Sequence, residues 1–507
     1  MTGSPLLPRW YALLSAIGGG VCLWAAFAPA SIGVLVIPGA ALVSASCWRA
    51  SVRRGLLTGF VAGLAFFVPL LNWLHIIGSD AWLLLSAFCA CWFALMGAGI
   101  SLVTRLRCAA VWVPCVWVLQ EALRGSVPWG GFPWGSVSFA ATGSPVLAWS
   151  PWVSSTGVTW LAVFAGSAVV TVIPRPWPRR NAAWIAGALL VIVGGLTLPT
   201  LPASKSSGAV VAVIQGGTPQ LGMGAMDVRR AVLDNHVSQT LALAAAVKSG
   251  KEAQPDLVVW PENASDLDPF QDASAATAIR AAARAISAPI LVGAIVYPPT
   301  DPQGLWNSGI LWDPVRGPGQ RYVKTHPVPF GEYIPLRSLI SRVVGRFDRI
   351  PRDFRAGDSP GIFTLGGLTF GDAICFEVAY TNVMHDLING GADFLTVQTN
   401  NATYGDTAQP DQQFAIERMR ARELGRTLVV AATTGISGFI DASGGVQQSL
   451  EQDSVGYLVQ HVTTSQSPPP GVRFGTVISA TLCSVALIAI VVAAITRRRR
   501  RLPMVIA

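Results

Sequence analysis

The most informative property of this sequence is how little charge it carries, above all negative charge. Only 12% of its 507 residues are charged and the mean hydropathy is +0.49, whereas soluble domains carry roughly 25% charged residues. Before residue 206 the only acidic residues are Asp80 and Glu121. Such a segment cannot keep an ordinary solvated surface, although residues 206–470 have normal polar content. The scarcity of charge excludes a wholly soluble protein and indicates a lipid-embedded part joined to a water-soluble one.

The sequence also lacks a basic stripe interleaved with aromatic residues, which a nucleic-acid groove would need. The formal net charge of +9 comes largely from short arginine clusters beside apolar runs, including residues 497–501. Clusters of this kind mark the cytoplasmic ends of membrane spans. Nucleic acid is therefore excluded as a partner.

Cysteine is scarce in the polar part of the chain. Seven of the eight cysteines fall inside apolar runs, where a thiol behaves as a small hydrophobic group: Cys22, Cys47, Cys89, Cys91, Cys108, Cys115 and Cys483. Cys375 stands alone in residues 206–470, which excludes a disulfide framework there. A solitary thiol of this kind is either an inert core residue or a nucleophile.

Apolar runs that could cross a membrane occur eight times along the chain. A hydrocarbon core of about 30 Å takes roughly 20 apolar residues in a helix. The predicted spans are 9–28, 32–48, 55–77, 81–104, 108–124, 156–173, 183–201 and 474–496. Arginines gather in every second connecting segment, and lysine and arginine mark the cytoplasmic side. Both termini are therefore predicted to be cytoplasmic, with residues 206–470 outside the cytoplasmic membrane.

The polar region alternates between short apolar runs and helical patterns, which is typical of layered α/β domains. The predicted strands are 209–214, 257–260, 290–295, 368–374, 394–397 and 428–432, and the predicted helices are 228–247, 273–286 and 412–424. The predicted domains are residues 1–205 (seven transmembrane helices), 206–470 (the catalytic domain) and 471–507 (a closing helix with a basic tail).

Cys375 ends one of these predicted strands, where α/β sheets commonly place reactive groups. A thiol near pKa 8.5 is mostly protonated at neutral pH, so a nucleophile needs a base or a cation nearby. Glu262 follows the strand 257–260, and Lys324 is followed eight residues later by Glu332. A lone glutamate or lysine is usually only a solvated side chain. The joint occurrence of Glu262, Lys324 and Glu332 with a solitary cysteine, however, allows a comparison with known families.

These residues resemble the nitrilase superfamily, whose members use a Glu-Lys-Cys triad on an α-β-β-α sandwich. With spans on either side, the resemblance narrows to the apolipoprotein N-acyltransferases and covers nearly the whole chain. The motifs that carry it are 26–29, 131–134, 213–216, 324–335, 371–377, 399–400 and 418–426. It implies a polytopic α-helical membrane domain with eight transmembrane helices and an extracytoplasmic nitrilase-like sandwich domain.

The resemblance implies a two-step transfer in the bacterial cell membrane. Cys375 takes an acyl chain from a phospholipid as a thioester and passes it to the α-amine of a diacylglyceryl-modified apolipoprotein cysteine. Glu262 is the general base and Lys324 stabilises the oxyanion, while Glu332, Phe376 and Glu377 support the site. No cofactor and no metal are expected. In some bacteria this family is coupled to a polyprenol-phosphate glycosyltransferase, which makes such an enzyme a candidate partner.

Two departures from the family bear on which lipid and acceptor are used. Family members commonly have tyrosine directly after the nucleophile, where this chain has Phe376. Many also carry a tryptophan near positions 220–224, where this chain reads Gln-Leu-Gly-Met-Gly. Residues 129–152 and 334–355, which are rich in large apolar side chains, are candidates for a cover that keeps water from the thioester. For residues 334–355 the alternative is a surface helix packed on the catalytic domain.

Two other functions use some of the same features. A membrane-tethered amidase that hydrolyses a C–N bond would use the same triad, although a soluble amide would not require eight spans. A transport or scaffold protein would need no triad at all. A Cys-His pair with His326 or His385 is disfavoured, since neither histidine lies in a supporting local pattern.

Overall fold

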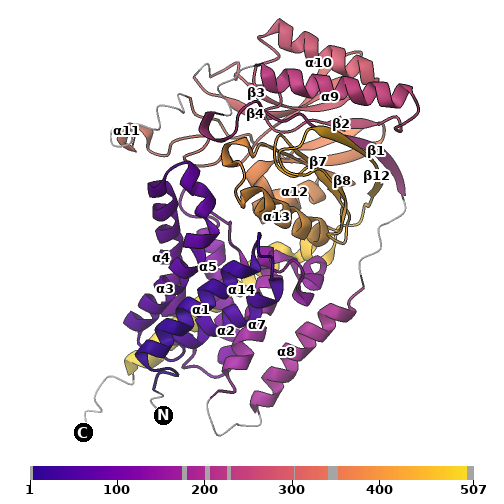
Figure 1. Ribbon diagram of the computed structural model, residues 1–507. Coiled ribbons are helices and arrows are strands. Elements are labelled where there is room, and N and C mark those ends of the chain that lie inside the picture. The colour runs from indigo at the N-terminus through magenta and orange to yellow at the C-terminus, as the bar shows by residue number, and fades with distance from the viewer. Residues whose placement is uncertain are drawn as a thin grey trace, which may run out of the picture. The chain divides into compact units, whose positions relative to one another are not determined.

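The computed structural model describes residues 4–173, 180–199, 206–224, 230–301, 303–340 and 352–499. The chain divides into two compact units (Figure 1): Met1–Thr200 with Pro469–Ala507, and Leu201–Pro468. Part of the segment 334–355, predicted to cover the thioester, lies outside the described residues, namely residues 341–351. Residues 500–507 of the basic tail also lie outside them.

The first unit is built from helices. These are α1 (Arg9–Ala26), α2 (Val36–Cys47), α3 (Val52–Leu70), α4 (Ser79–Val103), α5 (Ala109–Arg124), α6 (Val137–Ala140), α7 (Ser150–Val170), α8 (Arg180–Thr197) and α14 (Pro470–Arg499). Each of the eight predicted spans overlaps one of these helices, and the short α6 lies between two of them.

Four stretches in the described residues are long and apolar enough to cross a membrane: Val52–Leu70, Ser79–Val103, Pro145–Val170 and Pro470–Arg499. Two further apolar helices, Gly33–Cys47 and Asn181–Thr197, are shorter than the roughly 20 residues that a span needs. The prediction of a membrane-embedded helical region is confirmed. The number of eight spans stays a prediction.

Glycines allow α3 and α4 to pack backbone against backbone. A Cβ on Gly55 would lie 2.5 Å from the carbonyl oxygen of Gly97, and a Cβ on Gly59 would lie 2.2 Å from that of Phe93. Small residues four apart are the usual means of close helix packing in lipid, where no hydrophobic effect drives helices together. This pair of helices therefore has the interface expected of a membrane protein.

The second unit contains two six-stranded sheets. The first has the order β12-β1-β2-β3-β4-β5 and the second the order β11-β10-β9-β8-β7-β6. The strands of the first sheet are β1 (Ser206–Gln215), β2 (Leu257–Val259), β3 (Ile290–Val296), β4 (Trp306–Asp313), β5 (Gly317–Val323) and β12 (Gly456–Thr464). Those of the second are β6 (Ile362–Leu365), β7 (Leu368–Ile374), β8 (Phe394–Thr399), β9 (Leu428–Ala432), β10 (Gly438–Ile440) and β11 (Val446–Ser449). Strands β1 to β3 are parallel to one another, as are β7 to β9.

Helices cover the outer face of each sheet. Helices α9 (Ala231–Lys248) and α10 (Ala273–Ile286) pack on the first sheet, and α12 (Thr381–Asn389) and α13 (Gln409–Leu424) pack on the second (Figure 1). A short helix, α11 (Arg337–Ile340), lies in a connection. The four layers confirm the predicted nitrilase-like α/β sandwich.

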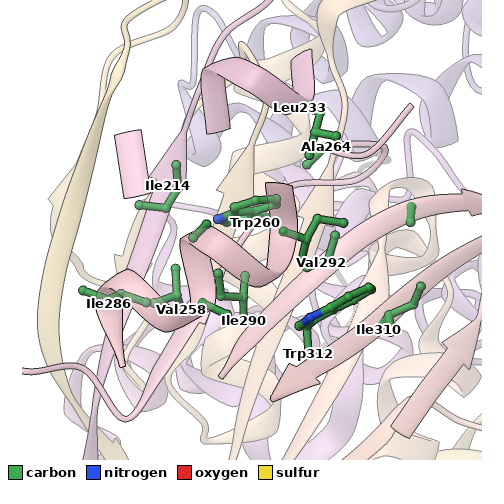
Figure 2. Close-up of a cluster of buried hydrophobic side chains, with 14 of the residues drawn as sticks. Ile214, Leu233, Val258, Trp260, Ala264, Ile286, Ile290, Val292, Ile310 and Trp312 are labelled. Atoms are coloured by element: carbon green, nitrogen blue, oxygen red, sulfur yellow. The ribbon is translucent and has the colours of Figure 1, made fainter. Parts of the chain in front are cut away.

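Two hydrophobic cores hold these layers together. Between the sheets, side chains such as Val211 and Leu291 face Phe370 and Val429, and all four are fully buried. The second core lies between the first sheet and its helices, where Trp260 and Trp312 are surrounded by aliphatic side chains (Figure 2). At about 25 cal/mol per Å² of buried apolar surface, such cores supply most of the favourable folding energy.

The sequence located the six strands that pair in parallel but missed the six that pair only antiparallel, β4, β5, β6, β10, β11 and β12. The predicted strands 368–374 and 428–432 coincide with β7 and β9. Strand β5 escaped prediction because it carries a proline and mostly exposed residues, as edge strands do. The predicted helix 228–247 corresponds to α9, but its first two residues lie outside the described residues.

Candidate active site

The nucleophile candidate stands on a strained turn. Cys375 directly follows β7 and is the first residue of a 3₁₀ turn, η6 (Cys375–Ala379). Its backbone φ is 55°, in the left-handed region that residues with a side chain rarely adopt. Such strain persists only where the surroundings enforce it, and it is frequent at active sites. The turn presents the half-buried thiol at the carboxyl end of a central strand.

Burial raises the pKa of the Cys375 thiol to about 12, and the negative charge of Glu262 adds to this effect. The ammonium of Lys324 and a hydrogen bond from the Thr399 side chain act in the opposite direction. The resting sulfur is therefore protonated. A reaction at this sulfur needs a base that removes the proton as the bond to the substrate forms.

Lys324 lies between two carboxylates. Its Nζ is 3.2 Å from Glu262 Oε1 and 3.0 Å from Glu332 Oε2, and its side chain is only 1% exposed. Burial lowers the pKa of Lys324, but the charges of Glu262 and Glu332 outweigh burial and hold it well above its usual range. The lysine is therefore a fixed positive charge and cannot serve as the base.

Glu262 is held by both of its oxygens. Besides the Lys324 ammonium, its Oε1 accepts a hydrogen bond of 2.7 Å from Asn307 Nδ2, and its Oε2 accepts one of 2.8 Å from the backbone N–H of Asn400. Asn307 Nδ2 also donates to Glu332 Oε1 at 2.8 Å. One amide thus joins the two carboxylates and fixes their positions relative to the lysine.

Glu377 links the nucleophile turn to the segment that carries the lysine. The carboxylate is fully buried and accepts hydrogen bonds from the backbone N–H groups of Ile374, Thr325 and His326 at 2.8, 2.8 and 3.1 Å. It also accepts one from the Tyr322 hydroxyl at 2.8 Å. These bonds bring residues on either side of Lys324 to the backbone next to Cys375.

Phe376, the other predicted supporting residue, is packed against aromatic neighbours. Its ring meets that of Tyr380 edge to face, with centroids 5.6 Å apart, and the His326 ring lies 4.6 Å from the same tyrosine. The second histidine, His385, pairs with Glu423 at 3.3 Å. Both histidines therefore have aromatic or carboxylate partners of their own.

The sequence analysis did not assign Asn307, Thr399 or Tyr404 to the site. Burial raises the pKa of the Tyr404 phenol, and the groups of Cys375 and Glu262 add to this effect, so the phenol lies within their electrostatic reach. A usable signal existed for Thr399, since it stands two residues after the predicted strand 394–397 and belongs to the motif 399–400 of the family resemblance. Asn307 lies in a strand with no alternating pattern.

Within the described ranges, no three His, Cys, Asp or Glu side chains are grouped so as to hold a metal ion.

Comparisons with known proteins cover both units. A family model described as the apolipoprotein N-acyltransferase N-terminal domain matches residues 19–168, and one described as carbon-nitrogen hydrolase matches residues 211–467. The apolipoprotein N-acyltransferase of Mycolicibacterium smegmatis is 35% identical over 526 residues, which cover 99% of this chain and 88% of that protein. The protein of the same name from Methylococcus capsulatus is 30% identical over 455 residues, covering 85% of this chain and 86% of that protein. Among solved structures, a Nesterenkonia amidase from the nitrilase superfamily matches with a TM-score of 0.38 and 19% identity, covering 54% of this chain and 95% of its own.

These relatives match the helical unit as well as the catalytic one. A shared catalytic domain alone would leave a soluble hydrolase equally plausible, but the matches extend along almost all of both chains. The resemblance stated from the sequence is confirmed, and the chain belongs to the apolipoprotein N-acyltransferase family.

Proposed function

We propose that this N-acyltransferase works through a thioester on Cys375, with Glu262 as the general base and Lys324 as the oxyanion donor. The single observation that carries the proposal is the buried ammonium of Lys324, which contacts Glu262 at 3.2 Å and acts electrostatically on Cys375. These three groups come from the ends of strands far apart in the chain. Their convergence is the arrangement that covalent acyl transfer requires.

In the first step, Glu262 takes the thiol proton of Cys375 while the sulfur attacks the ester carbonyl carbon of a phospholipid. The negative charge that develops on the carbonyl oxygen is stabilised by Lys324 Nζ and by the backbone N–H of Phe376. The tetrahedral intermediate then expels the glycerol oxygen, which receives the proton from Glu262. A lysophospholipid leaves, and the acyl chain stays on the sulfur.

In the second step, the α-amine of a diacylglyceryl-modified apolipoprotein cysteine attacks the thioester carbonyl. Glu262 accepts a proton from the amine, and the sulfur leaves and is reprotonated. The product is an amide, and the enzyme returns to its starting state. One carboxylate therefore serves as base and acid in both halves of the reaction.

Glu332 and Glu377 serve as positioning residues in this proposal. Glu332 contacts Lys324 Nζ at 3.0 Å and also accepts a hydrogen bond from the backbone N–H of Val328 at 2.6 Å. Glu377 ties the nucleophile turn to the Lys324 segment. Preorganised charges of this kind cost no reorganisation when the oxyanion forms, and the loss of one donor typically costs about 3–4 kcal/mol in the barrier.

We also propose eight membrane spans with both termini in the cytoplasm and the domain division 1–205, 206–470 and 471–507. The arginine clusters in alternate connecting segments support the orientation, and the two compact units support the division. A fluorescent protein fused to the C-terminus should fluoresce, and alkaline phosphatase fused there should be inactive. The reverse result would overturn the orientation. Coupling to a polyprenol-phosphate glycosyltransferase stays a prediction.

The decisive experiment looks for the acyl-enzyme. Purified full-length protein is incubated with phospholipid vesicles, and its cysteine peptides are analysed by mass spectrometry. We expect a fatty acyl adduct on Cys375 that disappears when a diacylglyceryl lipopeptide is added, with the lipopeptide gaining the same mass. Cys375→Ala should abolish both events, whereas Cys22→Ala, in the first helix, should leave them unchanged.

The amidase alternative makes the opposite prediction. An amidase would hydrolyse small amides and would carry no lasting acyl adduct in the presence of phospholipid. Acylation of the lipopeptide by Cys375→Ala at the wild-type rate would exclude the thioester.

A further inference from the structure

A chain of buried polar side chains runs along α13 and ends beside the nucleophile. Gln409, Gln413 and Glu417 are spaced four apart and so share one face of the helix. They meet Thr399, the last residue of β8, and Asn401, two residues further along the chain. Each of the five side chains is at most 4% exposed. Buried polar groups in such number are costly unless every one is hydrogen-bonded.

Gln413 lies at the centre of this chain and uses its whole amide. Its Nε2 donates to Thr399 Oγ1 and to Glu417 Oε1, both at 3.0 Å. Its Oε1 accepts from Asn401 Nδ2 and from Gln409 Nε2, both at 3.1 Å. An amide has two hydrogens and a carbonyl oxygen with two lone pairs, so all four are engaged. This saturation holds the amide in one orientation.

The orientation of Gln413 decides what Thr399 can do. Because Thr399 Oγ1 accepts a hydrogen from Gln413, its own hydroxyl hydrogen is left to be donated. One acceptor is Asn401 Oδ1, at 3.4 Å, which is longer than the 2.5–3.0 Å usual for a hydroxyl donor. The other is the sulfur of Cys375, since Cys375 and Thr399 each come directly after the paired residues Ile374 and Gln398 of the parallel strands β7 and β8. A hydrogen bond from the Thr399 side chain lowers the pKa of this thiol. A negative charge on the sulfur would draw the hydroxyl hydrogen to it.

We propose that Thr399 is a further catalytic residue that donates its hydroxyl hydrogen to the Cys375 thiolate, and that Gln413 is the positioning residue that orients it. The inference rests on the proposed function, in which the sulfur gains negative charge as it loses its proton in the first step and again as it leaves in the second. Thr399 keeps its proton throughout, because the thiol proton goes to Glu262. Its hydrogen bond stabilises the charge on the sulfur and transfers nothing.

The rest of the site explains why such a donor is useful. Lys324 Nζ contacts two carboxylates. Their negative charges weaken the stabilisation that the ammonium alone gives to a charged sulfur. Burial raises the pKa of Glu417 to about 8, although the Gln413 hydrogen bond lowers it. Glu417, at the end of the hydrogen-bonded side chains farthest from Cys375, is therefore largely uncharged at neutral pH. These hydrogen-bonded side chains thus place a hydrogen-bond donor beside the thiolate without adding a further negative charge.

The test measures the thiolate directly. Purified full-length protein in detergent is treated with iodoacetamide at pH 8, and alkylation of the Cys375 peptide is followed by mass spectrometry. Since a hydrogen bond to a charged group shifts an ionisation by about one pH unit, Thr399→Val should lower the alkylation rate about tenfold. Thr399→Ser keeps the hydroxyl and should restore the rate. Gln413→Met should lower it about threefold.

A matched control is Thr427→Val, because Thr427 is buried at the opposite end of the neighbouring parallel strand β9. This variant should be alkylated at the wild-type rate, and melting curves of all variants identify any that are unfolded. A wild-type rate in Thr399→Val or in Gln413→Met overturns the proposal, as does a Thr399→Ser variant no faster than Thr399→Val. Alkylation needs neither lipid nor acceptor, so it tests the hydrogen bond independently of acyl transfer. If Thr399→Val slows alkylation but the wild-type protein forms no acyl adduct, the transfer scheme is refuted and the proposed hydrogen bond is retained.

Discussion

Replacing Lys324 with methionine removes the ammonium that contacts both Glu262 and Glu332. Methionine keeps the unbranched apolar part of the side chain but leaves the two carboxylates hydrogen-bonded to Asn307 Nδ2, at 2.7 and 2.8 Å, without that positive charge. The side chains of the two glutamates are only 6% and 14% exposed, so water cannot screen them well. Removing one partner from a buried ion pair typically costs about 3–5 kcal/mol.

This cost translates into a melting temperature. In domains of about 150–250 residues, 1 kcal/mol corresponds to about 2–4 °C, so we expect Lys324→Met to lower the transition of the catalytic unit by about 10 °C. The chain has 18 tryptophans, so intrinsic fluorescence can follow unfolding of the purified protein in detergent.

Two further variants separate charge from packing. Adding Glu332→Gln to Lys324→Met leaves a single carboxylate that Asn307 and the Asn400 N–H can satisfy, so the double variant should melt higher than Lys324→Met alone. Lys251→Met removes an exposed lysine and should have little effect. The reasoning is refuted if Lys324→Met melts within about 2 °C of the Lys251→Met control, or if the double variant is no more stable than the single one.

Two other predictions concern the interior of the catalytic unit. A Cβ on Gly309 would lie 2.7 Å from both Asp372 Oδ2 and Gln398 Oε1, so Gly309→Ala should cost about 1–3 kcal/mol, whereas Gly456→Ala, with no atom nearer than 3.6 Å, should melt like wild type. His236 is fully buried and accepts a hydrogen bond from the Gly216 N–H at 3.2 Å, and burial lowers its pKa to about 4, although its bond to the Val232 carbonyl raises it. Because its pKa in the unfolded chain is about 6.5, the stability it contributes is complete above pH 6.5 and falls by about 3 kcal/mol as the pH drops to 4. Melting curves between pH 4 and 7 should show this slope in wild type and a flatter one in His236→Gln; equal slopes would contradict the assignment.

The sequence sufficed for the residues whose position follows from a strand. Glu262 and Cys375 each stand just beyond a buried apolar run, at the carboxyl end of a parallel strand, where α/β sheets commonly place reactive groups. The two strands belong to different sheets, so only the packing of the sheets brings the two residues together. The solitary cysteine in a polar region, and the arginines between apolar runs, were equally visible without coordinates. These signals are local, because they depend only on the order of apolar and polar residues along the chain.

The tertiary structure alone decided which polar side chains complete the site. Asn307 lies in a strand with no alternating pattern, and its amide matters only because two glutamates, 45 residues before it and 25 after it, come within 2.7 and 2.8 Å of its nitrogen. The hydroxyl of Thr399 accepts a hydrogen bond from Gln413, which stands fourteen residues later on a helix that packs against the same sheet. A hydrogen bond depends on distance and angle between groups that the fold brings together. Sequence order determines where a side chain can stand, and packing determines which partner it meets.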